Sequence, residues 1–452
     1  MDVIVPLTPA FKLQTWPGSC TRACYNVYDL DDETKALHLQ KLLLSPQRQT
    51  KQRGVPECYS CAVHIANNGL AIPRFYGLFE LGLAEHDNTV PGTAVSYTFD
   101  GVLKPYQRTA IDATIKSIQR FGGAMLSAAC GSGKTVMSIA IAAILRVRAV
   151  VLVHKGFLLD QWRERIAAFA PDATVGVVGQ GINDLDHTPD ITLCTIQTIL
   201  SRFKPGDGTF NYIGLVAVDE CHHVCARSFM KALQCFPARY RLGITATPER
   251  RDGLGFALPW FFGPVAAMIK RTATNLDVQW LDGALDLRPV LNHRNGDLLY
   301  AATVTSLTTC RERNDKIIQV IEKALAARRQ IIVISERRTQ LQLLRETLGQ
   351  GTLYVGETSK EKKETRDLRA QTANPLFATF AMAEEGLDVP RLDFLVFASP
   401  RASPACIEQC VGRIQRPLED KPTPTVVDFR DGVFRGMAKG RERLYKKWKN
   451  QK

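Results

Sequence analysis

An apolar run that leads into a glycine-rich loop is the feature that most constrains how this chain folds. Residues 124–129 are apolar or small, and they run into Ala128-Ala-Cys-Gly-Ser-Gly-Lys-Thr135. Glycines in such a loop let the backbone turn its N–H groups onto a polyphosphate, and a helix begins where the loop ends. A strand, loop and helix in this order predict a parallel α/β sheet. The strict form of the loop has glycine at the position of Ala128.

The loop predicts a site for ATP and Mg²⁺. Gly131, Ser132 and Gly133 are expected to bring backbone N–H groups to the phosphates. Lys134 supplies a point charge for the β- and γ-phosphates, and the Thr135 hydroxyl is expected to ligate Mg²⁺.

A second motif, Asp219-Glu-Cys-His-His223, ends the apolar run 213–218. This places both carboxylates at the carboxyl end of a strand, where α/β sheets bind their ligands. Asp219 is then suited to the metal and Glu220 to the attacking water. Together the two motifs predict ATP hydrolysis.

Length and composition set the broad class. At 452 residues, with 45% hydrophobic and 23% charged residues, the chain is expected to form two or three ordinary globular domains. Its start lacks a signal peptide pattern, and its longest apolar region, 137–153, is interrupted by Arg146 and Arg148, so no membrane partner is expected. Twelve scattered cysteines favour a reduced, intracellular setting, cytoplasmic or nuclear, and that of a host cell if the protein is viral.

The net charge of +13 is unevenly distributed. Residues 1–100 carry 8 Lys/Arg and 10 Asp/Glu, whereas the remainder carries 50 and 35. A basic body favours a polyanionic partner, although many basic proteins bind no nucleic acid.

The chain divides into five predicted segments: an N-terminal accessory domain (1–98), an ATP-binding domain (99–270), a linker with one small hairpin (271–304), a C-terminal domain (305–434) and a basic tail (435–452). Both larger domains alternate β-rich runs with helical patterns, which predicts parallel sheets. Besides 124–129, the expected strands are 149–153, 191–195, 216–219 and 242–245, then 331–335, 353–355, 377–380, 394–398 and 426–429.

Further motifs follow in a fixed order. They are Leu103-Lys-Pro-Tyr-Gln107, Val151-Leu-Val-His-Lys155 with Gln161-Trp162, Thr195-Ile-Gln-Thr198, Gly243-Ile-Thr-Ala-Thr-Pro-Glu-Arg250, Val333-Ile-Ser-Glu-Arg337, Ala378-Thr-Phe-Ala-Met-Ala-Glu-Glu-Gly-Leu-Asp-Val-Pro390 and Gln409-Cys-Val-Gly-Arg-Ile-Gln-Arg416. With the two motifs above, this series resembles the superfamily 2 helicases of the DExH type over roughly residues 100–431. The resemblance implies two tandem RecA-like domains, ATP in the cleft between them and a nucleic-acid strand across the top.

The resemblance also implies roles for matching residues. Gln107 would read the adenine edge, and Gln409, Arg413 and Arg416 would act at the γ-phosphate, where an arginine finger is worth on the order of 10³–10⁵ in turnover. The remaining roles are contact with ATP (Gly386, Asp388), coupling of the nucleotide to the strand-binding side (His222, Thr245, Thr247) and contact with the strand (Thr195, Gln197, Thr379).

Within the superfamily the chain is most similar to the branch of XPB-type DNA helicases, phage recombination helicases and transcript-release helicases of large DNA viruses. That branch implies duplex or forked DNA as substrate, transcription or recombination machinery as partners, and a monomer. An RNA helicase and the motor subunit of a restriction-type complex are alternatives, as is a degenerate motor that serves as a DNA-binding scaffold.

Two features at the ends of the chain leave alternatives open. Cys20, Cys24, Cys58 and Cys61 form two close pairs, which fit either a four-thiolate zinc site or buried free thiols. The tail from residue 435 carries eight basic residues and one acid, with Tyr445 and Trp448 among them. It fits either a nucleic-acid tail with stacking rings or the solvated face of a terminal helix.

Overall fold

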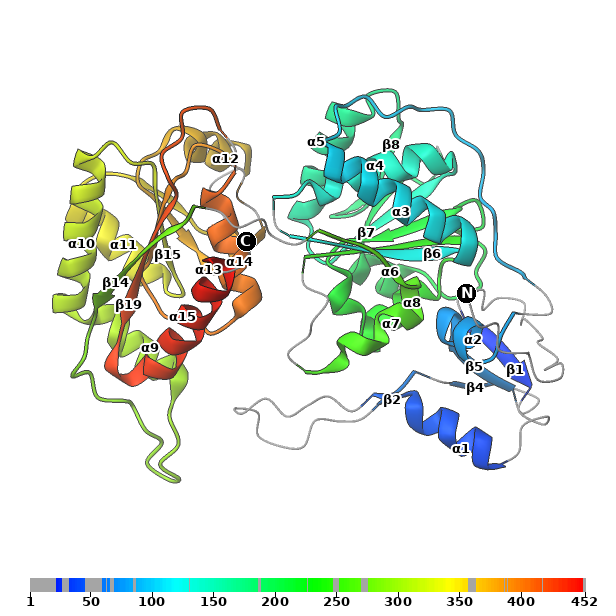
Figure 1. The fold of residues 1–452 in the computed structure, drawn as a ribbon, viewed down its shortest axis with the longest axis horizontal. Coiled ribbons are helices and arrows are strands. Elements are labelled where there is room, and N and C mark those ends of the chain that lie inside the picture. The colour runs from blue at the N-terminus through cyan, green and yellow to red at the C-terminus, as the bar shows by residue number, and fades with distance from the viewer. Residues whose placement is uncertain are drawn as a thin grey trace. The chain divides into compact units, whose positions relative to one another are not determined.

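The protein is described here by a computed structural model, which divides into two compact units, Met1–Lys270 and Arg271–Lys452 (Figure 1). The residues that the structure describes are 22–26, 32–44, 59–61, 63–65, 69–83, 87–129, 131–185, 188–225, 227–246, 252–269, 275–356, 363–385, 387, 389–416 and 418–449.

The first unit is built on an eight-stranded sheet with the strand order β13-β6-β12-β11-β7-β10-β8-β9. Its strands are β6 (Gly123–Ala128), β7 (Ala149–Val153), β8 (Val175–Gly179), β9 (Ile182–Asn183), β10 (Ile191–Thr195), β11 (Leu215–Val218), β12 (Tyr240–Thr245) and β13 (Val265–Ile269). All neighbours pair in parallel except β8 and β9. The five strands predicted from this part of the sequence are therefore confirmed, as is the α/β class.

Helices cover both faces of this sheet (Figure 1). The helices are α3 (Pro105–Phe121), α4 (Lys134–Leu145), α5 (Phe157–Phe169), α6 (Ile196–Arg202), α7 (Arg227–Leu233) and α8 (Pro259–Phe262), with 3-10 turns at Cys221–Cys225 (η2) and Leu254–Ala257 (η3). In β7, Val150 and Leu152 join the core beneath α6–α8, whereas Val151 and Val153 join the core beneath α3–α5. Burial on both faces explains why these strands are continuous apolar runs in the sequence.

The second unit has a six-stranded, all-parallel sheet in the order β14-β19-β18-β15-β17-β16. Its strands are β14 (Asp277–Asp282), β15 (Ile331–Ser335), β16 (Thr352–Tyr354), β17 (Leu376–Thr379), β18 (Phe394–Phe397) and β19 (Thr425–Arg430). Its helices are α9 (Tyr300–Thr309), α10 (Arg311–Ala326), α11 (Arg338–Leu348), α12 (Lys363–Thr372), α13 (Phe380–Glu385), α14 (Pro404–Ile414) and α15 (Arg435–Lys449), with a 3-10 turn η4 (Gly432–Phe434). Side chains of α10 and α11 fill the core on one face of the sheet, and those of α13, α14 and α15 fill the core on the other.

Residues 271–304, for which the sequence predicts a linker, supply an edge strand of this sheet. Strand β14 pairs in parallel with β19 along its whole length. Its exposed positions Asp277, Gln279 and Asp282 give the segment the polar composition that suggested a linker. A short antiparallel bridge between Leu291 and Leu298 follows, where the sequence predicts a hairpin.

The N-terminal segment packs directly on the first unit. It contains a three-stranded antiparallel sheet, β1-β5-β4 (Arg22–Asn26, Gly69–Pro73, Val63–Ile65), a pair β2-β3 (Leu43–Leu44, Tyr59–Ser60) and the helices α1 (Asp32–Lys41) and α2 (Arg74–Glu80). The Tyr76 ring meets the Trp260 ring edge-on at 5.2 Å, and Arg74 Nη1 donates to Arg239 O at 2.8 Å. Leu42, Leu44 and Ile72 belong to the same hydrophobic cluster as the first sheet. The accessory segment thus shares a core with the ATP-binding domain.

The C-terminal segment forms a terminal helix, α15, and the prediction that its rings stack on bases is wrong. Tyr445 and Trp448 are 3% and 7% exposed, because both rings pack into the core of the second unit. Rings buried in this way are not available to stack on bases. Among the described helices, none combines the length and apolar character that a membrane span requires.

We predict that Asp431→Ala lowers the free energy of unfolding by about 3–5 kcal/mol, because removing one partner of a buried ion pair leaves the other charge uncompensated. Asp431 Oδ1 accepts from Arg313 Nε at 2.8 Å, and both side chains are 1% exposed. Urea denaturation followed by circular dichroism measures the loss. The control is Asp315→Ala on α10, the helix that carries Arg313, where the pair with Arg311 is exposed and is worth about 1 kcal/mol or less. Equal losses in the two variants would contradict the assignment.

Candidate active site

The loop between β6 and α4 has the backbone geometry of a phosphate cradle. Gly131 and Gly133 have φ of +81° and +85°, in the left-handed region that favours glycine. A Cβ atom at Gly133 would also lie 2.4 Å from Gln107 Nε2, so any other residue would displace the Gln107 side chain. Helix α4 begins at Lys134 and directs its first N–H groups toward the loop. This arrangement suits a polyphosphate.

Hydrogen bonds brace the loop from three sides. Gln107 Nε2 donates to Ser132 O at 2.9 Å, and Gln107 Oε1 accepts from the Lys104 N–H at 2.9 Å. Tyr106 Oη donates to the same Ser132 oxygen at 3.2 Å. Lys134 Nζ donates to Ala128 O at 3.1 Å. Gln107, for which the sequence predicts adenine contact, therefore ties the start of α3 to the phosphate loop in this structure.

The parallel sheet places Asp219 beside β7, at the carboxyl edge of the sheet. The Asp219 N–H donates to Leu152 O at 3.0 Å, which extends the ladder between β11 and β7. Both oxygens of the Asp219 carboxylate accept a hydrogen bond at 2.9 Å: Oδ1 from the Glu220 N–H, and Oδ2 from Trp162 Nε1. Each oxygen keeps further lone pairs, and oxygen ligands are those that Mg²⁺ prefers. Asp219 and the Thr135 hydroxyl therefore fit the predicted metal.

Trp162 is a site residue for which the sequence suggested no role. It lies on α5, is 3% exposed, and fixes the orientation of the Asp219 carboxylate through its indole N–H. Its place in the Gln161-Trp162 pair marked it only as part of a motif. The partner of the indole lies 57 positions further along the chain, so only the fold reveals the contact.

Glu220 is joined to two of the predicted coupling residues. Its φ of +47° lies in the left-handed region, which is rare for a residue with a side chain. His222 Nδ1 lies 3.3 Å from Glu220 Oε2 and 3.0 Å from Thr245 Oγ1. The structure thus links the predicted water-polarising carboxylate to the end of β12 through one imidazole. Thr247 lies outside the described residues.

The two carboxylates differ in pKa. Burial raises the pKa of Asp219, and the neighbouring Glu220 carboxylate raises it further, against the hydrogen bond from Trp162. Burial also acts to raise the pKa of Glu220. There the His222 side chain beside the carboxylate and the charge of Lys134 outweigh it and hold the pKa below its usual range. Glu220 is therefore the carboxylate whose surroundings favour the charged form.

The residues predicted to contact nucleic acid lie at, or just after, the ends of β-strands in both units. Thr195 is 7% exposed and caps helix α6: its Oγ1 accepts from the Thr198 N–H at 3.2 Å. Gln197 is exposed, and its Nε2 donates to His154 O at 3.0 Å. Thr379 is half-buried at the end of β17.

In the second unit, Gln409 lies half-buried on α14, one helical turn before Arg413. The Arg413 guanidinium donates to Ala383 O at 2.7 Å, to Leu387 O at 2.9 Å and to Glu384 O. Three carbonyls at the end of α13 therefore hold it in place. Arg416 Nη2 donates to Leu387 O at 3.1 Å. Gly386 and Asp388, the predicted ATP contacts on this loop, lie outside the described residues.

The zinc hypothesis gains no support from the described residues. No group of three or more metal-binding side chains occurs among them. Cys20 and Cys58, and the side chain of Cys24, lie outside what the structure describes. Cys61 is buried, with its Sγ 3.7 Å from Met230 Sδ.

Comparison with known proteins gives two family matches. Residues 100–250 match the family "Type III restriction enzyme, res subunit", and residues 312–417 match "Helicase conserved C-terminal domain". "Putative ATP-dependent RNA helicase L396" of Acanthamoeba polyphaga mimivirus is 29% identical over 84% of this chain and 75% of its own length. "Probable helicase D10" of Escherichia phage T5 is 27% identical, over 71% of each chain. "DNA 3'-5' translocase XPB2" of Sulfurisphaera tokodaii is 32% identical over 36% of this chain and 35% of its own.

The chain is a superfamily 2 helicase. Its relatives include viral helicases and an XPB-like translocase, which is consistent with the branch that the sequence resembles. The helicase is therefore a nucleic-acid-dependent ATPase that uses Mg-ATP.

Solved structures agree on the fold. "S. cerevisiae Dbp5 bound to RNA and ADP BeF3" has a TM-score of 0.55 at 12% identity, covering 83% of the helicase and 91% of that chain. "ATP-dependent Type ISP restriction-modification enzyme LlaBIII bound to DNA" has a TM-score of 0.55 at 17% identity, covering 73% of the helicase but only 28% of that chain. The prediction of two RecA-like domains is confirmed.

We predict that Trp162→Phe destabilises the helicase by about 1–3 kcal/mol more than Trp260→Phe does, because it removes a hydrogen bond to a buried carboxylate. Trp260 is the control because its ring contacts are with the Tyr76 and Phe256 rings. The measurement is urea denaturation of both variants in the wild-type and the Asp219→Asn backgrounds. A double-mutant cycle that shows no coupling between residues 162 and 219 would contradict the role of the indole.

Proposed function

We propose that this helicase is an ATP-dependent DNA helicase or translocase. It couples ATP hydrolysis to movement along, or separation of, duplex or forked DNA, in viral transcription, replication or recombination, and it works as a monomer. The observation that carries this proposal is the similarity of 36% of this chain to a protein named as a DNA translocase. The basic balance of residues 101–452 supports a polyanionic partner.

The chemistry of the nucleotide site follows from residues of the first unit. Backbone N–H groups at Gly131, Ser132 and Gly133 receive the phosphates, and Lys134 compensates their charge. Asp219 and Thr135 would hold Mg²⁺, which when bound would offset the negative charge that develops on the phosphate oxygens. Glu220, ionised and oriented by its contact with His222, aligns and polarises the attacking water.

The contacts from Glu220 through His222 to Thr245 couple the nucleotide site to the side of the sheet that binds nucleic acid. Thr245 ends β12, so a change in the partner of Glu220 during hydrolysis is transmitted to the strand end. Thr195, Gln197 and Thr379 are proposed to meet the sugar-phosphate backbone, which positions the protein without reading sequence.

The two arginines of the Gln409–Arg416 motif are proposed to have different roles in ATP hydrolysis. Arg413 donates to three carbonyls around the end of α13, so it positions the loop that carries Gly386 and Asp388. Arg416 Nη2 also donates to Leu387 O, but Arg413 is the arginine committed to the carbonyls around α13. We therefore assign the finger role chiefly to Arg416, with Gln409 beside it.

A panel of polymers tests the proposed function. Steady-state ATP hydrolysis is measured without nucleic acid, then with single-stranded, duplex and forked DNA and with RNA. Strong stimulation by DNA and little by RNA is expected. Stimulation mainly by RNA would overturn the DNA assignment in favour of an RNA helicase, the activity that the name of the mimivirus relative states.

Glu220→Gln is the control for this panel. It keeps the phosphate and metal ligands, so it should bind ATP normally while turnover is lost with every polymer. Loss of ATP binding in this variant would contradict the role assigned to Glu220.

We predict that Arg416→Ala lowers kcat by about 10³-fold while the affinity for ATP changes little, because a finger acts chiefly in the transition state. The matched variant Arg413→Ala should also lower the melting temperature, since it leaves three carbonyls without their donor. Steady-state kinetics, nucleotide-binding titrations and thermal melts separate the two effects. Equal losses of kcat and ATP affinity in Arg416→Ala would count against a finger.

A further inference from the structure

The outward face of α15 carries a row of cations that the helicase motifs do not include. Arg435, Lys439, Arg443 and Lys447 recur at every fourth position, and all four are exposed. Residues four apart lie next to one another on a helix, so these side chains form one row about 18 Å long. Lys446 and Lys449 are exposed near its end.

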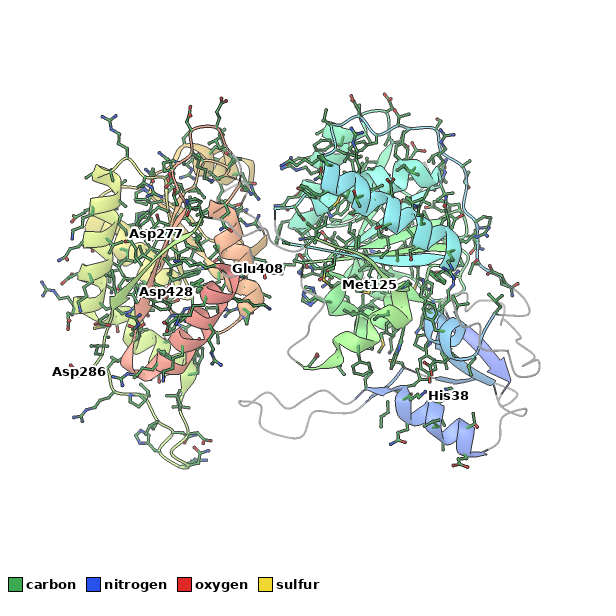
Figure 2. The ribbon with its side chains drawn as sticks, in the orientation of Figure 1. His38, Met125, Asp277, Asp286, Glu408 and Asp428 are labelled. Carbon is green, nitrogen blue, oxygen red and sulfur yellow. The ribbon has the colours of Figure 1, made fainter. Side chains whose placement is uncertain are left out.

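The inner face of α15 fixes the direction in which this row points. Arg441 Nε and Nη2 donate to Asp428 at 2.7 Å and 2.8 Å, and both side chains are buried. Tyr445 Oη donates to the same carboxylate at 3.0 Å. Asp428 lies on β19 beneath the helix (Figure 2). The helix cannot rotate without breaking this buried network, so the row stays on the solvent side.

The row is unfavourable for the helix itself. Like charges four residues apart repel one another, and Arg435 lies in the first turn, where the helix dipole disfavours cations. Glu442 is the only acid of the helix, and it pairs with Lys446 at 3.3 Å. Within the described part of the chain, no carboxylate lies within ion-pair distance of the four cations of the row. A polyanion would relieve this repulsion.

Two glycines lie beside the row on the exposed surface of the helix. Gly436 and Gly440 are exposed, and a Cβ atom at either position would meet nothing within 4 Å among the described residues. Glycine is less favourable than alanine inside a helix, and packing does not require it here. The bare backbone lets another molecule approach the helix closely, between the cations.

We propose that this face of α15, Arg435 to Lys447, binds the phosphate backbone of the nucleic acid on which the helicase acts. The inference rests on the proposed function and adds a binding surface outside the helicase motifs. Cations that neutralise phosphates give affinity without sequence preference. A membrane surface is a poorer occupant, because an interfacial helix inserts its apolar face and the apolar face of α15 is buried in the core.

The test is the salt dependence of nucleic-acid binding by the full chain. The variant Lys439→Ala/Arg443→Ala is compared with wild type by fluorescence anisotropy of labelled duplex and single-stranded DNA between about 50 and 200 mM salt. The slope of log K against log salt is negative, and each lost phosphate contact makes it shallower, by about 0.9 on duplex DNA and about 0.7 on a single strand. For this variant we expect a slope on duplex DNA that is shallower by about 1.8, with weaker binding at every salt concentration.

The control variant is Arg311→Ala/Lys323→Ala, which removes two exposed cations from α10 on the other face of the sheet. It should leave the slope close to the wild-type value. Thermal melts check that both variants are folded. An unchanged slope in Lys439→Ala/Arg443→Ala would overturn the contact and favour an acidic protein as the occupant. Absence of wild-type binding to any DNA or RNA at low salt would instead overturn the proposed function.

A glycine variant tests the close approach separately. Gly440→Ala should raise the melting temperature, because alanine favours the helix, and should lower the affinity for DNA at the same time. A folding defect cannot give these opposite signs. Unchanged affinity in Gly440→Ala would overturn the close approach of the nucleic acid to the helix backbone.

Discussion

The parallel pairing of β6, β12, β11 and β7 is the constraint on which the active site depends. Parallel strands end at one edge of the sheet, so the phosphate loop after β6, Asp219 after β11 and Thr245 at the end of β12 lie at that edge. A shift of one residue in any of these pairings would turn a functional side chain to the opposite face. Apolar side chains on both faces fix the register, and thereby the geometry of the site.

Hydrogen bonds then determine what each side chain can do. The Asp219 carboxylate is held by one donor on each oxygen, whereas Glu220 is held in an unfavourable backbone conformation and touches His222. The pKa values of two adjacent carboxylates with similar burial are thus shifted in opposite directions. Hydrogen bonds also hold the phosphate loop, since Gln107 and Tyr106 donate to Ser132 O and the Ser132 hydroxyl donates to Ala129 O.

The sequence predicts best where a local pattern decides the outcome. Strands 149–153, 191–195 and 331–335 match the structure because complete burial makes them uninterrupted apolar runs. Strand β14 was missed because an edge strand with exposed Asp and Gln side chains has no such run. Contacts between distant segments were missed for a different reason. The hydrogen bond from Trp162 to Asp219 and the bonds from Arg413 to three carbonyls join distant segments, so no local sequence pattern predicts them. The same holds for Tyr445 and Trp448, whose rings pack against residues far earlier in the chain.

The network around Asp428 also determines what the end of the chain contributes to the second unit. Loss of α15, by proteolysis or by a premature stop, would leave the buried Asp428 carboxylate without its hydrogen bonds from Arg441 and Tyr445. It would also expose the core residues that Tyr445 and Trp448 cover. Helix α15 is therefore an integral part of the second RecA-like domain, because its side chains complete the core. A shortened chain would keep every helicase motif and still lack a closed core for the domain that carries the last three of them.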